Sequence, residues 1–271
     1  MGAPQRIWSI VDREPLVLLG TAAGISDRPT GTHLSRTMML ADLRRLLAQT
    51  PASADARTYR AAVIDENVLL KPTLSTRRIS HRRLCDLYLL NPELVLFHAL
   101  RELWPGDDEA QPLLALLCAL ARDLLLRSSA ELMLALPPGE PVTPQQFTAV
   151  VQAAFPDRYS VASLHSLGQN IASSWQQAGH LVGKLHKVRA QARCRPHAVA
   201  YALLLGQLQG VRGDRLFQTL WVRVLDAPQH VLHAQAQVAA QHGWLEYRRA
   251  GEVVELDFRH LLRSFPQGEG S

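Results

Sequence analysis

Carboxylates are almost absent from a long internal stretch of the sequence. Between Glu140 and Asp214 the only acidic residue is Asp157, whereas seven lysines and arginines lie in the same span. Seven cations against one anion give this span a net charge of +6, although the whole 271-residue chain carries only +5. The rest of the protein is therefore nearly neutral, and a concentration of positive charge of this kind is typical of a surface that binds a polyanion.

Cysteines and long apolar runs are also scarce. Cys85, Cys118 and Cys194 lie far apart, which supports neither a disulfide framework nor a zinc site and fits a reducing compartment. The most apolar run, residues 112–121, is about half as long as a membrane span requires. Charged residues interrupt the N-terminus before a signal-peptide core forms. We therefore expect a cytoplasmic protein with no membrane partner.

Enzyme signatures are missing as well. Residues 179–184, GHLVGK, end like a phosphate-binding loop but are one residue short and lack the hydroxyl after the lysine. His230 and His233 have a spacing that metals use, with Asp226 one turn earlier, but ordinary surface histidines are the usual interpretation of such a pair. No serine, threonine or cysteine adjoins a partnered base. We expect no catalytic residue, no metal and no cofactor.

What the sequence does contain is helical periodicity. Residues 32–138 predict five or six helices with short connections, a bundle-like domain in which residues 109–136 form one long helix or two. One of these helices carries a second cationic patch around His81. The patch is either a solvated face paired with acids from elsewhere or an auxiliary phosphate contact, and its arginines are Arg77, Arg78, Arg82 and Arg83.

Residues 139–195 predict a different arrangement. Thr143 and Pro144 suit the start of a helix that Pro156 ends, and Ser160 suits the cap of a longer helix that Gly179 ends. Apolar residues recur on the longer helix at steps of three and four. Gly168 inside it costs about 1 kcal/mol relative to alanine. Residues 181–193 then read as a β-hairpin that turns near Gly183.

The order of helix, turn, long helix and basic hairpin predicts a winged helix, with residues 160–178 as the recognition helix. The outer face of that helix is polar but uncharged, and short amides and hydroxyls are able to bond base edges or phosphates. An ordinary solvated helix followed by a basic loop is the alternative. The predicted groove contacts are Ser163, His165, Ser166, Gln169, Asn170 and Ser173, and the predicted phosphate contacts are Lys184, Lys187, Arg189 and Arg193.

The remaining C-terminal sequence repeats this order in weaker form. Residues 196–262 predict three helices and a hairpin around Ala250 and Gly251, which is a degenerate second winged helix. Its charge is mixed, so we expect a structural or protein-contact role. Residues 1–31 are predicted to be an N-terminal arm and residues 263–271 a disordered tail. The fold class expected is mainly α.

Four segments together resemble the BrxA family, which are small accessory proteins of bacteriophage-exclusion (BREX) and phage-growth-limitation systems. The segments are ENVLLKPTLSTRR, LYLLNPELVLFHALRELW, ALARDLLLRSSAE and SLHSLGQNIASSWQQAGHLVGKLHKVR. The resemblance covers residues 30–195 and lies mainly in the order of the elements. It implies a non-enzymatic, cytoplasmic, DNA-binding protein that acts beside a methyltransferase and ATPase-type partners. The chain is longer than this resemblance by its segment from about 196 to 262.

The sequence thus favours a non-enzymatic protein of antiviral defence that binds double-stranded DNA through a recognition helix and a basic wing. Two alternatives remain open. A structural adaptor would use the same elements to contact partner proteins of a defence complex, and an RNA-binding protein would prefer RNA in competition with duplex DNA.

Overall fold

The computed structural model describes residues 21–28, 31–251, 253–263 and 265. Most of the predicted N-terminal arm and nearly all of the predicted tail therefore lie outside the described residues. The protein is mainly helical, with a few short strands. Among the described helices, none combines the length and the apolar composition needed to cross a membrane.

The N-terminal part is built from short helices around α6. Residues 109–136, expected as one helix or two, form three, because Asp123 interrupts the run and caps α7 by accepting hydrogen bonds from the amides of Leu125 and Leu126 at 3.0 and 3.2 Å. The elements are η1 (Thr32–Leu34), α2 (Leu40–Gln49), α3 (Ala56–Ile64), α4 (Leu74–Tyr88), α5 (Val95–Leu103), α6 (Gln111–Arg122), α7 (Leu124–Ser128) and α8 (Ala130–Ala135).

Residues 141–189 form what we call the first unit. It contains β1 (Pro141–Val142), α9 (Pro144–Ala154), α10 (Val161–Gln177), β2 (Leu181–Val182) and β3 (Lys187–Arg189). Its strands make an antiparallel sheet in the order β1-β3-β2. The two helices begin where their caps predict, since the Thr143 amide donates to Gln146 at 2.7 Å and the Ser160 hydroxyl accepts from the Ser163 amide at 3.3 Å.

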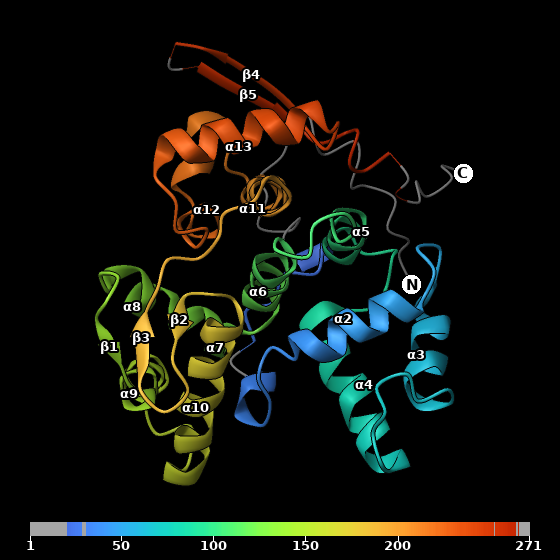
Figure 1. Cartoon of the computed structure of the whole chain (residues 1–271), viewed down its shortest axis with the longest axis vertical. Coiled ribbons are helices and arrows are strands. Elements are labelled where there is room, and N and C mark those ends of the chain that lie inside the picture. The colour runs from blue at the N-terminus through green and yellow to red at the C-terminus, as the bar shows by residue number, and fades with distance from the viewer. Residues whose placement is uncertain (1–20, 29–30, 252, 264, 266–271) are drawn as a thin grey trace.

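The second unit spans residues 196–257 and lies at the other end of the molecule (Figure 1). It consists of α11 (Pro196–Leu208), η2 (Gly213–Gln218), α12 (Leu220–Arg223), α13 (Gln229–Gln241), β4 (Glu246–Ala250) and β5 (Val253–Asp257). The last two strands form a hairpin of their own that projects past α13 (Figure 1).

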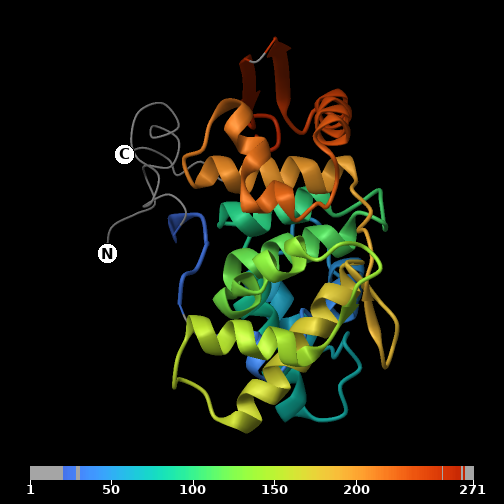
Figure 2. The ribbon, with the colours of Figure 1, turned by 90° about the vertical axis from the view of Figure 1, so that its left-hand side faces the viewer.

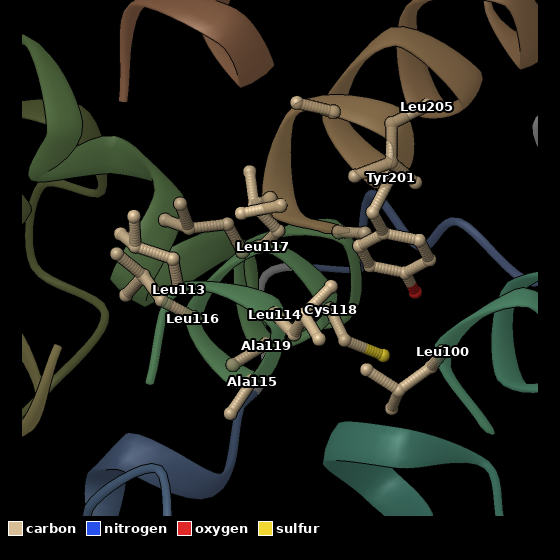
Figure 3. Packing of buried hydrophobic residues seen from close by; sticks show 14 of the residues in the cluster. Leu100, Leu113, Leu114, Ala115, Leu116, Leu117, Cys118, Ala119, Tyr201 and Leu205 are labelled. Carbon is tan, nitrogen blue, oxygen red and sulfur yellow. The ribbon is translucent and has the colours of Figure 1, made fainter. Parts of the chain in front are cut away.

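One hydrophobic core runs through all of these parts. Helix α6 lies at its centre, and helix α11 packs across it with Tyr201 and Leu205 (Figure 3). Both helices are apolar on nearly every side, so burial of each leucine contributes about 1.5–3 kcal/mol. The Tyr201 hydroxyl also donates to the carbonyl of Leu96 at 2.8 Å. The first and second units are consequently stacked along a shared core, as the side view shows (Figure 2).

Candidate nucleic-acid interface

Helix α10 presents the uncharged polar face that the sequence predicts. His165, Ser166 and Gln169 are exposed, whereas Ser163 and Ser173 are half-buried. The opposite side of the helix is fully buried through Leu167, Ile171 and Trp175. The amphipathic pattern therefore places three of the predicted groove contacts on the surface and leaves the others at its margin.

Asn170 has a second task that sequence reasoning missed. Its side-chain nitrogen donates to the carbonyl of His33 at 2.9 Å, which ties α10 to η1. A buried polar cluster lies directly beneath this contact. The His33 ring bonds the Asp123 carboxylate through Nδ1 at 2.7 Å and the Ser174 hydroxyl through Nε2 at 2.8 Å. These contacts join η1, the start of α7 and α10.

The order of serine, histidine and aspartate in this cluster is that of a hydrolase triad, but its setting is different. A nucleophile must be reachable by substrate, and all three residues are at most 1% exposed. The Ser174 hydroxyl is also held by the Met38 amide at 2.8 Å and the Asn170 carbonyl at 2.9 Å. The cluster therefore acts as a buried clip that fixes α10 against the N-terminal helices.

The electrostatics of the clip favour an ionised Asp123. Burial opposes ionisation of this carboxyl, but the charge of His33 and the hydrogen bonds from His33 and Leu126 outweigh it and hold the pKa of Asp123 below its usual value. A buried carboxylate with several donors is stabilised in this way. The clip is therefore polar, fully partnered and sensitive to acid.

The hairpin between β2 and β3 carries two of the predicted phosphate contacts. Lys184 is exposed in its turn, and Lys187 is half-buried, with its ammonium donating to the Gln176 side chain. Gln176 in turn donates to the Gly183 carbonyl at 3.0 Å, so α10 holds the hairpin in place. Leu185 lies between the two lysines in the sequence, at the tip of the hairpin, and is 89% exposed. The Lys187 ammonium and the turn that carries Lys184 and Leu185 are thus attached to α10 through Gln176.

The prediction that Arg189 contacts phosphate is wrong. Arg189 is only 3% exposed, and its guanidinium makes a two-pronged pair with Asp226, with both N–O distances 2.8 Å. It also donates to the carbonyl of Met133 at 3.1 Å. The central strand of the three-stranded sheet points this side chain inward, where it joins the first unit to the second.

Arg193 is exposed, but it is not the isolated cation that the sequence suggests. It pairs with Glu109, and the neighbouring Arg195 pairs with Asp107 at 2.6 Å. Both acids precede α6 and lie far from this region in the sequence. Since at least three of the seven cations in the acid-poor span have carboxylate partners, the surface is less positive than the local composition indicates.

The arginines of α4 are divided between structural and exposed positions. Arg77 donates to the Ile64 carbonyl at 3.2 Å, and Arg83 pairs with Asp86 at 3.3 Å. Arg78 and Arg82 are exposed. Helix α4 lies across η1 from α10 (Figure 1). The structure therefore does not merge the α4 patch with the α10 surface.

The histidines considered for metal binding and the comparisons with known proteins add no further site. In the part of the chain that the structure describes, no three histidine, cysteine or acidic side chains gather as a metal would require. His233 instead contacts the Tyr247 hydroxyl at 2.8 Å. Neither a family model nor a curated protein matches this sequence.

Proposed function

We propose that the protein binds double-stranded DNA without catalysing a reaction, using the first unit as a winged helix. The proposal is supported by the order strand, helix, helix, strand, strand in this unit and by its sheet order β1-β3-β2. In this arrangement α10 is the recognition helix and the β2–β3 hairpin is the wing. The single observation that carries the proposal is the exposed, uncharged face of α10 beside Lys184 and Lys187.

The charge available for phosphate is smaller than expected but well placed. Lys184 and Lys187 lie on the hairpin, and Arg158 is exposed just before α10. Arg193 is 76% exposed even in its pair with Glu109, and such a surface pair is weak enough to exchange for a phosphate. Arg78 and Arg82 form a separate second contact in this proposal. Phosphate contacts would set the affinity, while His165, Ser166 and Gln169 approach the base edges.

The resemblance to the BrxA family extends the proposal to biological context. A protein of this kind would act in the cytoplasm of a bacterium, in a phage-defence system, beside a methyltransferase and an ATPase-type partner. The exposed Leu185 at the wing tip also suits contact with a partner protein, so an adaptor role is the second candidate function.

The first test is a fluorescence-anisotropy titration of random-sequence duplex at several salt concentrations. Each phosphate contact contributes about 0.9 to the slope of log affinity against log salt. The double variant Lys184→Ala with Lys187→Ala should therefore weaken binding to all sequences and flatten the slope by about 2. The charge-matched control is Arg45→Ala with Arg57→Ala, which removes two exposed arginines from α2 and α3.

Three outcomes separate the candidate functions. Equal loss of affinity in the lysine variant and the arginine control would contradict the assignment of the wing. Preference for RNA in competition with the same duplex would favour the RNA-binding alternative. Absence of salt-sensitive binding by the unaltered protein would leave the adaptor role as the better account.

A further inference from the structure

We infer that the second unit provides a second duplex-binding surface, formed by the outer face of α13 and the β4–β5 hairpin. This inference rests on the proposed DNA binding by the first unit and extends it. It assigns to residues 229–250 a contact with the same duplex, so that the protein covers more DNA than α10 alone spans.

The outer face of α13 resembles that of α10 in chemistry. Its exposed residues are Gln229, His230, Ala234, Gln237 and Gln241. No lysine, arginine, aspartate or glutamate occurs anywhere between residues 227 and 245. Exposed helix faces in soluble proteins usually carry charged residues. A row of amides without carboxylates is instead compatible with a polyanion and offers both donors and acceptors to base edges, since glutamine pairs with adenine.

The hairpin that follows α13 supplies cations. Arg248 and Arg249 are exposed on β4. Tyr247, two residues before Arg249 on β4, contacts the His233 ring of α13 through its hydroxyl at 2.8 Å. Because side chains alternate along a strand, Arg249 lies on the same face of β4 as Tyr247, which is the face toward the helix. As in the first unit, a polar helix is followed at once by a β-hairpin with two cations.

The hairpin of the second unit also carries acids, and these limit how much it contributes to duplex binding. Arg248 is opposite Glu255 in the strand register and lies 3.6 Å from Glu246. These groups are substantially exposed, and pairs of this kind contribute little stability. Arg248 is therefore able to turn to a phosphate, but the local field is weaker than around Lys184. We expect the second surface to strengthen binding without dominating its salt dependence.

The junction between the units fixes the two surfaces relative to each other. Asp226 lies three residues before α13 and is gripped by Arg189 of β3, by the Ala192 amide at 3.2 Å and through its carbonyl by Gln191 at 2.9 Å. His180 adds a hydrogen bond to the Val224 carbonyl at 2.8 Å. The segment that leads into α13 is thus attached to the wing of the first unit.

The views agree on where α13 and the β2–β3 hairpin lie. Helix α13 and the β2–β3 hairpin lie on the same side of the molecule in Figure 1 and again in Figure 2. A single straight duplex that follows this side would pass both. A rigid pair of contacts of this kind makes binding depend on duplex length, because the second contact becomes effectively intramolecular once the DNA reaches it.

The test compares a duplex of about 12 base pairs with one of about 30, which are about 40 and 100 Å long at 3.4 Å per base pair. Gln237→Glu adds one negative charge to the face of α13, and Gln49→Glu, at the exposed end of α2, is the charge-matched control. The ratio of variant to unaltered affinity is taken at each length, which cancels the larger number of sites on longer DNA. Gln237→Glu should lose about tenfold on the long duplex only, and Gln237→Lys should gain on the long duplex only.

The outcomes distinguish this inference from the proposed function. If the unaltered protein binds neither duplex, the proposed function fails. If it binds both but Gln237→Glu matches Gln49→Glu on the long duplex, only the second surface is refuted. Equal losses on both lengths would mean a general field effect and would also refute it. If Gln237→Glu left the affinity for the long duplex unchanged and α13 captured a partner protein, the face would be assigned to protein binding instead.

Discussion

Each unit ends in a helix followed by a β-hairpin, but the two units differ in charge and in bracing. In the first unit the hairpin presents Lys184 and Lys187, and β1 adds a third strand to its sheet. In the second unit the hairpin is two-stranded, and Arg248 lies opposite Glu255. A helix followed by a hairpin thus carries a cationic hairpin at one end of the molecule and a hairpin of mixed charge at the other.

Helices α10 and α13 also differ in how they are held. Helix α10 is tied to the N-terminal helices by the His33, Asp123 and Ser174 clip. Helix α13 is held by packing against α11 and by His233, whose ring contacts Phe217 and the Tyr247 hydroxyl at 2.8 Å. Because charge-assisted hydrogen bonds add geometric specificity, we expect α10 to be held more rigidly than α13. Under the proposed DNA binding, α10 would be the principal contact and α13 the auxiliary one.

The largest expected effect comes from the junction that joins the units. Arg189→Ala leaves the Asp226 carboxylate partly buried and unpaired, so we expect the free energy of unfolding to fall by about 3–5 kcal/mol. Arg193→Ala is the control, because its pair with Glu109 is exposed and contributes at most about 1 kcal/mol. Urea denaturation followed by circular dichroism measures both. Equal losses would mean that Arg189 does not hold the units together.

Arg189 also shows why the sequence predicted the surface only in part. The acid-poor span suggested seven available cations, yet the partners of Arg189, Arg193 and Arg195 lie 37, 84 and 88 residues away. Net charge along a sequence does not report net charge in space. Local signals were more reliable, because the caps at Thr143 and Ser160 act within three residues.

The clip beneath α10 gives the next largest effect. Asp123→Asn keeps the oxygen that caps α7 but turns an amide toward the two donors of His33, so we expect a loss of about 2–3 kcal/mol at pH 7. Asp86→Asn is the control, since Asp86 is about half exposed beside Arg83, and it should change stability by less than about 0.5 kcal/mol.

The pH dependence of the same variant tests the cause. The pKa of Asp123 is lower in the folded state, so its contribution is complete above its unfolded value of 3.8 and is lost as pH falls through the folded value. Burial lowers the pKa of His180 from 6.5 to about 4. The fold therefore loses stability as the pH falls from 6.5 to about 4, by the same amount in the variant and in the unaltered protein. The difference between variant and unaltered protein should therefore shrink only below about pH 4. A constant difference down to pH 3 would rule out the ionised clip.

The clip could not be found from sequence for the same reason as the ion pairs. His33 and Ser174 are 141 residues apart, and Asp123 is 90 residues from His33. Asn170 was predicted as a groove contact because it lies on the polar side of α10, but periodicity cannot distinguish solvent from a neighbouring loop such as the one at His33.

The smallest expected effect comes from replacing one glycine in each unit with alanine. A Cβ at Gly168 of α10 would lie 2.4 Å from the Pro144 carbonyl oxygen of α9, whereas one at Gly206 of α11 would lie 2.9 Å from a methyl of Leu216. Backbone cannot yield as a side-chain end can, so overpacking should cost Gly168→Ala about 1–3 kcal/mol. The gain in helix propensity, about 1 kcal/mol, offsets part of this cost.

Gly206→Ala has the same propensity gain and a softer neighbour, so its stability should stay within about 1 kcal/mol of the unaltered protein. Thermal melts separate the two, since 1 kcal/mol shifts the midpoint by about 2–4 °C in a chain of this size. The expected ranking follows from close contact between α9 and α10, which positions the polar face of α10. If Gly168→Ala proved the more stable variant, the two helices would not be in close contact at Gly168, and the glycine in α10 would need another explanation.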